Sequence, residues 1–117
     1  MKSPFTISSN VEIYKFDQLF INQKRIDLLC LVRDKGSINA ASKQMKMSYQ
    51  QAWHFIKEMN ELSPLPLVVR QRGGSNGGGA EVTKFGNKII ARFEMIKDEI
   101  NTCKQKLNEK MADTFFR

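Results

Sequence analysis

Glycine and serine residues divide the middle of this 117-residue chain into short helical segments. Between Lys24 and Lys35, apolar residues recur at helical spacing, and Gly36 stands where a glycine commonly ends a helix. The Ser37 hydroxyl can accept a hydrogen bond from a free backbone N–H and so begin a second helix over residues 38–45. These stop and start positions predict two short helices in close succession.

A third helix is predicted to begin at Ser48. Ser48 and Gln51 fit the capping box S-x-x-Q, in which each side chain satisfies a backbone N–H of the other residue. One apolar stripe then runs along the helix: Ala52, Ile56 and Met59. Pro64 and Pro66 prevent the helix from continuing, and residues 46–47 form the turn before it. Two short capped helices around such a turn predict a helix-turn-helix.

Segments that favour β-structure flank this helical region. Residues 10–23 alternate apolar and charged side chains and predict a short hairpin or a pair of edge strands. Residues 67–72 and 80–83 lie on either side of a glycine-rich loop and predict a second hairpin. A long final helix is expected from Lys84 to about Lys110, in which Gly86 permits a close contact.

Length and composition limit the chain to one folding unit. The sequence is 41% hydrophobic and 26% charged, as in ordinary globular proteins, and its length leaves little room for a second core. We therefore expect one domain over 1–117, mainly α with a small β component. Its expected parts are an N-terminal β segment over 10–22, the helix-turn-helix and second hairpin over 24–83, and a C-terminal helix over 84–112.

Cysteine usage and hydropathy favour a cytoplasmic protein. Cys30 and Cys103 each stand in an apolar stretch, which predicts buried, reduced thiols. The N-terminus lacks the apolar core of a signal peptide, and the longest apolar run, residues 28–32, is too short to cross a bilayer. We expect no membrane contact, and the sequence suggests no cofactor and no small-molecule effector.

The loop within residues 70–84 holds five of the seven glycines and admits three interpretations. A phosphate cradle requires G-x-x-x-x-G-K-S/T or G-x-G-x-x-G directly before a helix, and neither pattern is present. A disordered linker fits poorly, because segments that look structured flank the loop on both sides. A hairpin wing fits, since glycines permit positive φ and close approach, while Arg70 and Arg72 supply charge at its base. A helix-turn-helix followed by such a basic hairpin is a winged helix.

The charge distribution favours a nucleic-acid partner. The chain has a formal net charge of +7 and a pI near 9.6, and residues 35–57 contain four lysines and no acidic residue. Gln50, His54 and Lys57 lie at i, i+4 and i+7, on the face opposite the apolar stripe. Glutamine can pair with adenine, lysine can reach guanine or phosphate, and histidine can donate to either. These residues predict that the third helix reads bases in the major groove.

Some of these side chains also have purely structural interpretations. His54 can be a solvated surface residue, and Trp53 can belong to the core or its boundary. Tyr49 can bond a phosphate or simply close the end of the helix. The sequence leaves these alternatives open.

Several short strings resemble one family. GSI at 36–38, SYQQAW at 48–53, EMN at 58–60 and the glycine loop ending in VTKFG all lie between Arg25 and Ile90. Together they resemble the N-terminal winged-helix domain of the molybdate-responsive transcriptional regulators, the ModE family, with a LysR-type helix-turn-helix. The resemblance implies a dimeric DNA-binding repressor or activator.

The resemblance assigns candidate DNA-contact residues to two elements. Those on the recognition helix are Ser48, Tyr49, Gln50, Gln51 and His54, and those in the wing are Arg70, Arg72 and the glycines. The full expected set also includes Lys43, Lys46, Lys57, Gly74 and Asn76. Full-length members of the family bind molybdate on C-terminal oligonucleotide-binding-like domains, whereas this sequence ends at Arg117. We therefore expect a form without those domains and without oxyanion sensing: either a stand-alone regulator, or one whose signal comes from a partner or another ligand.

Six residues along the last helix follow a 4-3-4-3-4 spacing: Ile89, Phe93, Ile96, Ile100, Cys103 and Leu107. This spacing is typical of an apolar seam that packs against another helix. The seam can cover the helix's own domain or a second copy of the chain. Because a domain this small has little surface left for so long a seam, we expect a homodimer that binds double-stranded DNA at an inverted repeat.

Two rival functions belong to other classes. A winged-helix module can bind protein, in which case the basic helix face is incidental. An enzyme or redox switch has the least support, since the sequence offers one histidine, no Cys/His cluster with metal-ligand spacing and no nucleophile with a visible partner. We expect no enzymatic activity and no metal site.

Overall fold

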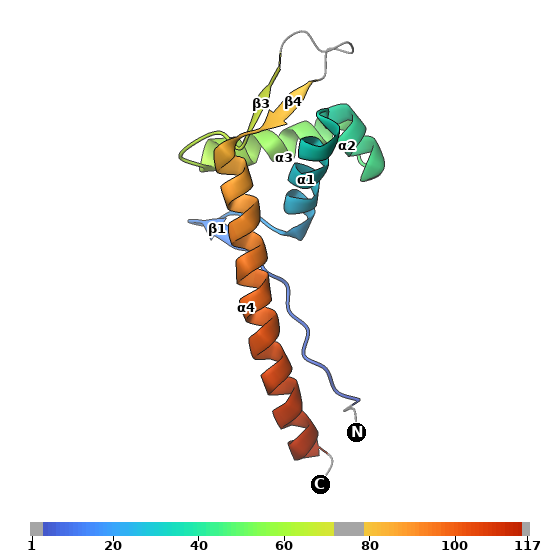
Figure 1. Ribbon diagram of the computed structural model, residues 1–117, viewed down its shortest axis with the longest axis vertical. Helices are drawn as coiled ribbons and strands as arrows, with labels where there is room; N and C mark the ends of the chain where they lie inside the picture. Colours follow the sequence, from blue (N-terminus) through green and yellow to red (C-terminus); the bar gives the residue numbers. More distant parts are fainter. Residues whose placement is uncertain (1–3, 72–78, 116–117) are drawn as a thin grey trace.

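The computed structural model describes residues 4–71 and 79–115. Its elements, in chain order, are β1 (Ile13–Lys15), β2 (Gln18–Ile21), α1 (Gln23–Lys35), α2 (Ile38–Gln44), α3 (Tyr49–Leu62), β3 (Val68–Arg70), β4 (Ala80–Val82) and α4 (Lys84–Phe115). In Figure 1, α1, α2 and α3 gather beside the upper end of α4, and β3 and β4 project from the same end. The predicted mainly helical winged helix is confirmed.

Hydrogen bonds within a few residues set the limits of the three short helices. Gly36 ends α1 in the left-handed conformation, with φ at 65°. Ser37 Oγ accepts from Ala40 N at 3.1 Å at the start of α2, and Ser48 Oγ accepts from Gln51 N at 3.0 Å at the start of α3. A cap of this kind typically contributes about 1 kcal/mol to helix stability. The three predicted helices are thus confirmed.

One apolar core holds the helices and the wing together. Ala52, Ile56 and Met59 are fully buried, which confirms the predicted stripe on α3. The stripe belongs to the same core as apolar side chains of α1, the wing strands and α4: Ile26, Leu28, Leu29, Val32, Val68, Val82, Ile90 and Phe93. Full burial of a large aliphatic or aromatic side chain stabilises the fold by about 1.5–3 kcal/mol. The core therefore fixes which face of α3 is turned outward.

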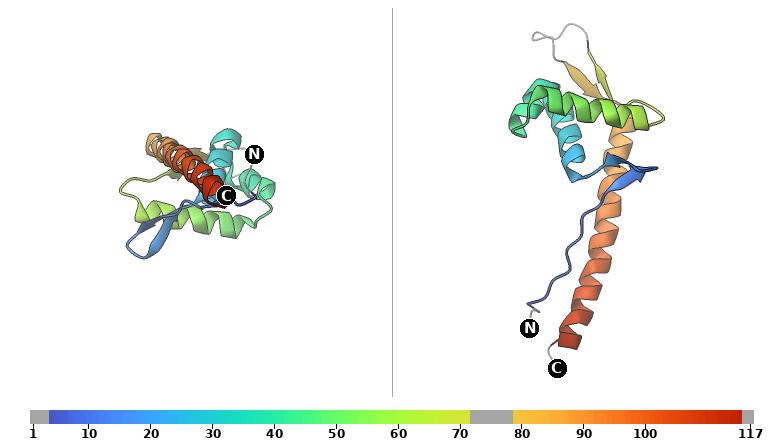
Figure 2. Two further views of the ribbon diagram at one scale, coloured as in Figure 1. Left: turned by 90° about the horizontal axis from the view of Figure 1, so that it is seen from below. Right: turned by 180° about the vertical axis from the view of Figure 1, so that it is seen from behind.

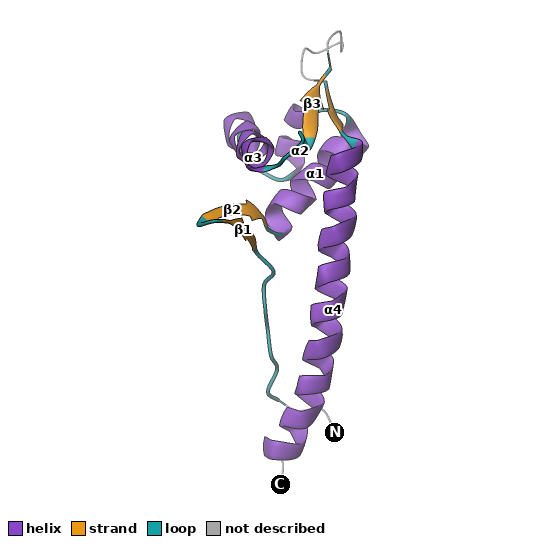
Figure 3. Cartoon of the chain, turned by 90° about the vertical axis from the view of Figure 1, so that its left-hand side faces the viewer, coloured by secondary structure: helices purple, strands orange, loops and turns teal. Residues whose placement is uncertain are grey.

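Both predicted hairpins are present and antiparallel. In the wing, Val68 on β3 lies opposite Val82 on β4. Ala80 N on β4 donates to Gly36 O at 3.1 Å, while Asn60 Nδ2 at the end of α3 donates to the backbone oxygen of Val68 at 3.0 Å. Figure 3 shows that β1 and β2 form a separate hairpin below α3, away from the wing. The base of the wing is therefore tied to the helix-turn-helix through each of its strands.

The long helix α4 projects well beyond the other elements (Figures 1 and 2). Its 32 residues continue to Phe115, past the predicted ends at 110 and 112, because no glycine or proline stands there to stop the helix. The N-terminal segment, residues 4–12, runs beside its far half, where Ile7 N donates to Asn108 Oδ1 at 2.9 Å. The molecule is consequently elongated, with a longest dimension of 65 Å.

Gly86 in the first turn of α4 permits the close contact that was predicted. A Cβ added there would collide with the backbone oxygen of Leu67 and would lie 2.7 Å from Val82 Cγ1. Because both neighbours belong to packed elements, the clash exceeds the gain of about 1 kcal/mol that alanine brings to a helix. We expect Gly86→Ala to lower the free energy of unfolding by about 1 to 3 kcal/mol in urea denaturation. Lys88→Ala, at an exposed position of the same helix, should change it by less than about 0.5 kcal/mol, and equal effects of the two substitutions would contradict the prediction.

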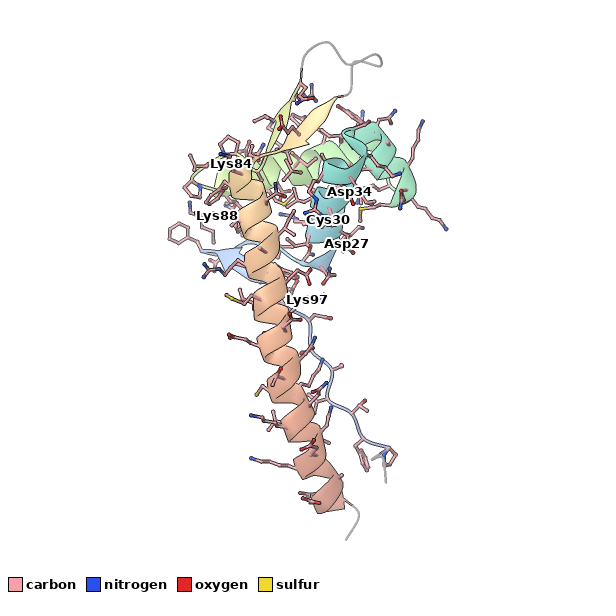
Figure 4. All side chains as sticks on the ribbon, viewed as in Figure 1. Asp27, Cys30, Asp34, Lys84, Lys88 and Lys97 are labelled. Atoms are coloured by element: carbon pink, nitrogen blue, oxygen red, sulfur yellow. The ribbon has the colours of Figure 1, made fainter. Side chains whose placement is uncertain are left out.

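The two cysteines are free thiols in different surroundings. Cys103 is exposed on the projecting part of α4, so its predicted burial is wrong. Cys30 is half-buried on α1, where Figure 4 shows it between Asp27 and Asp34. Burial raises the pKa of the Cys30 thiol; Arg33 opposes this rise, and the carboxylates of Asp34, Asp27 and Glu94 add to it. Because a raised pKa keeps the thiol protonated, Cys30 is a poor nucleophile.

None of the described helices is both long enough and apolar enough to cross a membrane.

Candidate nucleic-acid interface

The outward face of α3 presents polar and basic side chains together. Gln50, His54 and Lys57 are all exposed, on the side of the helix opposite the buried stripe. The candidates Ser48 and Gln51 are exposed at the start of the same helix, with Ser48 Oγ engaged by its cap. A helix held from behind by a close-packed core can present such side chains to a groove without further rearrangement.

Lysines of the preceding helix and turn lie close to this face in the chain. Lys43 is exposed in the last turn of α2, and Lys46 is exposed in the turn itself, with a positive φ of 57°. Figure 1 shows the α2–α3 turn at one end of α3. Both lysines therefore add positive charge at the entry to α3, which favours a polyanion there.

One acidic side chain on α3, Glu58, contacts Arg25 and His54 of its own chain. One of its oxygens accepts from Arg25 Nη2 at 3.0 Å, and the other contacts His54 Nε2. Arg25 is 5% exposed and also donates to the backbone oxygens of Leu19 and Phe20. The negative charge of Glu58 is thus compensated inside the domain, and the network joins β2, α1 and α3.

This network was not predicted from the sequence. Arg25 and Glu58 are separated by 33 residues, and neither stands in a motif that pairs them. The His54 side chain is 64% exposed, as the surface interpretation expects, but its Nε2 atom also contacts Glu58, a partner that the sequence did not predict. Arg25 is the third residue of α1 and shares a helical face with the buried Leu29 and Val32, so spacing could have indicated its burial but not its partners.

At the base of the wing, Arg70 packs against α3. Its guanidinium carbon lies 4.0 Å from the centre of the Trp53 ring, and its Nη2 donates to the Tyr49 hydroxyl at 3.1 Å. Trp53 is half-buried against the core, as the boundary interpretation of this residue predicts. Tyr49 makes a third kind of contact, with the wing, which neither sequence interpretation includes. Arg72, Gly74 and Asn76 lie outside the described residues.

The predicted seam on α4 divides into two parts. Phe93 is 1% exposed within its own chain, and Ile89 and Ile96 are half-buried. Phe93 belongs to the core of its own domain, so its assignment to a dimer interface is wrong. Periodicity alone could not reveal this, because core-facing and partner-facing residues share the same spacing.

The far part of the seam is open on the surface. Ile100 is 38% exposed, Leu107 is 43% exposed, and Cys103 between them is exposed. The N-terminal segment runs along one side of this stripe: residues 9–12 and Ile100 line the same pocket, and Ile7 N donates to Asn108 Oδ1. An exposed apolar stripe of this length remains available to a second helix.

In the described part of the chain, no group of three or more histidine, cysteine, aspartate or glutamate side chains could hold a metal ion.

Comparisons with known proteins bear on this site. No protein-family model matches the chain. It is 40% identical to the molybdenum transport protein ModE of Azotobacter vinelandii over 93 residues, which are 80% of this chain and 34% of that protein. It is also 40% identical, over 79 residues, to the transcriptional regulator ModE of Haemophilus influenzae and to the DNA-binding transcriptional dual regulator ModE of Escherichia coli K12. Those matches cover 68% of this chain and 31% and 30% of the two relatives.

The crystal structure of a LysR family transcriptional regulator is similar in fold. The two superpose with a TM-score of 0.53 at 17% sequence identity, covering 71% of this chain and 27% of that one. At this identity the likeness concerns the fold alone. The sequence relatives go further: this chain is homologous to the ModE regulators over most of its own length, and it spans about a third of theirs.

Proposed function

We propose that the chain is a sequence-specific, DNA-binding transcriptional regulator that acts in the cytoplasm. In this proposal α3 enters the major groove, and the wing lies on the adjacent backbone or in the minor groove. The observation that carries it is the outward face of α3, where Gln50, His54 and Lys57 are exposed together on a helix whose other face is fully buried. Homology to regulators named as DNA-binding proteins and a net charge of +7 support the same function.

The chemistry of the three side chains suggests distinct roles. Gln50 can bond an adenine edge through both atoms of its amide, and Lys57 can reach a guanine or a phosphate. His54 directs Nε2 to Glu58, which leaves Nδ1 for DNA. In the neutral ring the proton is then on Nε2, so Nδ1 accepts from an amino group of adenine or cytosine.

A homodimer completes the proposal. The exposed stripe at Ile100, Cys103 and Leu107 supports packing of α4 against α4 of a second copy. Two recognition helices related by a two-fold axis match an inverted repeat with half-site centres separated by about one helical turn or a multiple of it.

The base-reading role predicts a sequence-dependent loss of affinity. Gln50→Ala combined with His54→Ala should weaken binding to a duplex selected from a random pool by about tenfold or more, because each lost base contact is worth about 1–3 kcal/mol. Random duplex DNA should be bound nearly as well as by the unaltered chain, since its affinity comes from phosphates. Fluorescence anisotropy titrations on both duplexes would measure this.

A matched control for that experiment is Gln105→Ala, an exposed glutamine on the projecting part of α4. It should leave both affinities unchanged. Equal losses on selected and random DNA from the Gln50 and His54 pair would show that these residues do not read bases.

A protein-binding module is the second candidate function, and one observation favours it. Phe16 at the tip of the β1–β2 hairpin is 92% exposed, and Tyr14 beside it is 53% exposed. Exposed aromatics of this kind are common at protein interfaces. Binding to generic duplex DNA that weakens steeply with salt would favour the DNA-binding function, whereas no binding at low salt would leave the protein-binding module as the better explanation.

A further inference from the structure

The cluster of Tyr49, Trp53 and Arg70 connects the recognition helix to the wing. Tyr49 is the first residue of α3, Trp53 stands one turn later, and Arg70 is the last residue of β3. The Arg70 guanidinium lies over the Trp53 ring at 4.0 Å and donates to the Tyr49 oxygen at 3.1 Å. Two aromatic side chains of the helix therefore hold one charged side chain of the wing.

The contacts within the cluster leave hydrogen-bond donors available. A guanidinium carries five N–H donors and no acceptor, so its bond to Tyr49 engages one donor and uses the phenolic oxygen as acceptor. The hydroxyl proton of Tyr49 is not used in that bond. Arg70 is exposed and Tyr49 is half-buried. Adjacent donors from Arg70 and Tyr49 can thus point to one acceptor group outside the protein.

The cluster also has limited freedom to move. Trp53 is packed against the core, and Tyr49 is held by the first turn of α3. The strands of the wing are anchored at their base, through Ala80 to Gly36 and through Val68 to Asn60. Stacking on an indole removes rotamer freedom from the arginine before any ligand binds. The donors are consequently preorganised, which lowers the entropy cost of binding.

We propose that Tyr49, Trp53 and Arg70 form a prebuilt clamp for a single phosphate of the DNA backbone, and that the clamp fixes the register between the recognition helix and the wing. Arg70 and Tyr49 bind the phosphate, and Trp53 positions Arg70. A phosphodiester suits these donors because it is an anion that can accept from a guanidinium and a hydroxyl together. Tyr49 is also at the positive end of a 14-residue helix, which favours an anion there. The clamp rests on the proposed DNA-binding function.

Conservative substitutions test the clamp. Tyr49→Phe removes only the hydroxyl. Arg70→Lys keeps the charge but loses the planar guanidinium, which stacks on Trp53 and can donate two hydrogen bonds to one anion. Each should lower affinity about tenfold, equally for selected and random duplexes, because a phosphate contact carries no sequence information. The double variant should lose little more than either single variant, since both groups serve the same phosphate. Arg92→Lys, at an exposed arginine of α4, is the control and should bind as the unaltered chain does.

Duplexes with one uncharged phosphate separate a direct phosphate contact from a purely structural role, because only a direct contact makes the affinity depend on the charge at one position. In a series of selected duplexes, each carrying one uncharged methylphosphonate, the unaltered chain should lose about tenfold in affinity at one position in each half-site. Tyr49→Phe and Arg70→Lys should show less than a twofold loss at that same position while keeping their sensitivity elsewhere. Melting temperatures of the variants, measured alongside, should stay within about 3 °C of the unaltered chain's, which would show that the domain remains folded.

The possible failures are distinguishable. If the unaltered chain binds neither duplex at low salt, the DNA-binding function and the clamp both fail. If it binds DNA, the DNA-binding function stands, and any of three results overturns the clamp. The first is that both substitutions leave affinity as high as Arg92→Lys does, and the second is that the loss of the double variant equals the product of the two single losses. The third is that both variants keep the tenfold loss of the unaltered chain at the neutral phosphate.

Discussion

Replacing Ile100 and Leu107 together with aspartate should convert the chain from a dimer to a monomer and lower its affinity for an inverted repeat by about 100-fold or more. Both residues are partly exposed within their own chain, at 38% and 43%, so the substitution should leave the domain folded. In the proposed dimer it would place carboxylates from both chains in an apolar interface, where each unpaired buried charge costs several kcal/mol. Each half-site then binds a monomer independently, and the affinity gained by linking two recognition helices in one dimer is lost.

Sedimentation would measure the oligomeric state, and titration with duplex DNA would measure the affinity. Thr102→Asp with Gln105→Asp is a matched control, since it adds the same charge to the opposite face of the same exposed part of α4. The control should remain dimeric. The dimer model is refuted by an unaltered chain that is already monomeric at tens of micromolar, or by an Ile100 and Leu107 variant that binds the full site unchanged.

Arg25→Met should lower the free energy of unfolding by about 3 kcal/mol, because it leaves buried acceptors without their donor. Arg25 is 5% exposed, donates to the backbone oxygens of Leu19 and Phe20 at 2.8 and 3.2 Å, and pairs with Glu58. Its guanidinium also lies 5.1 Å from the centre of the Phe55 ring. Methionine can fill part of the space but can donate no hydrogen bond.

The same helix provides the control for that prediction. Arg33→Met removes an arginine whose side chain is 43% exposed and whose contacts with Asp34 and Asn87 are also exposed, so the expected change is below about 0.5 kcal/mol. Urea denaturation of the two variants would compare them directly. Equal effects would mean that the Arg25 network contributes no more than a surface ion pair.

The candidate interface was only partly predictable. The exposed set on α3 follows from a period of 3.6 residues, which turns Gln50, His54 and Lys57 away from a stripe that has to be buried. The connection from Arg70 to that helix does not follow from any period, because Tyr49 and Arg70 are 21 residues apart. Their contact depends on how the wing docks on the helix.

The seam on α4 shows the same limit more sharply. Its 4-3-4-3-4 spacing correctly indicates one apolar face, yet Phe93 lies in the domain core while Ile100 and Leu107 lie open on the surface. What separates them is the point at which α4 leaves the domain. That point is set by packing against α1 and β4.

The sequence by itself determined the elements, their order and most of their ends, because caps at Gly36, Ser37 and Ser48 and the spacing of apolar residues act within a turn or two of helix. Only the tertiary structure decided which distant residues work together. The pairing of Arg25 with Glu58, the stacking of Arg70 on Trp53 and the separation of core from free surface along α4 all join segments that are neighbours in space alone. The physical reason is that close packing selects one arrangement of the elements, and that arrangement fixes which polar groups must find partners and which remain free.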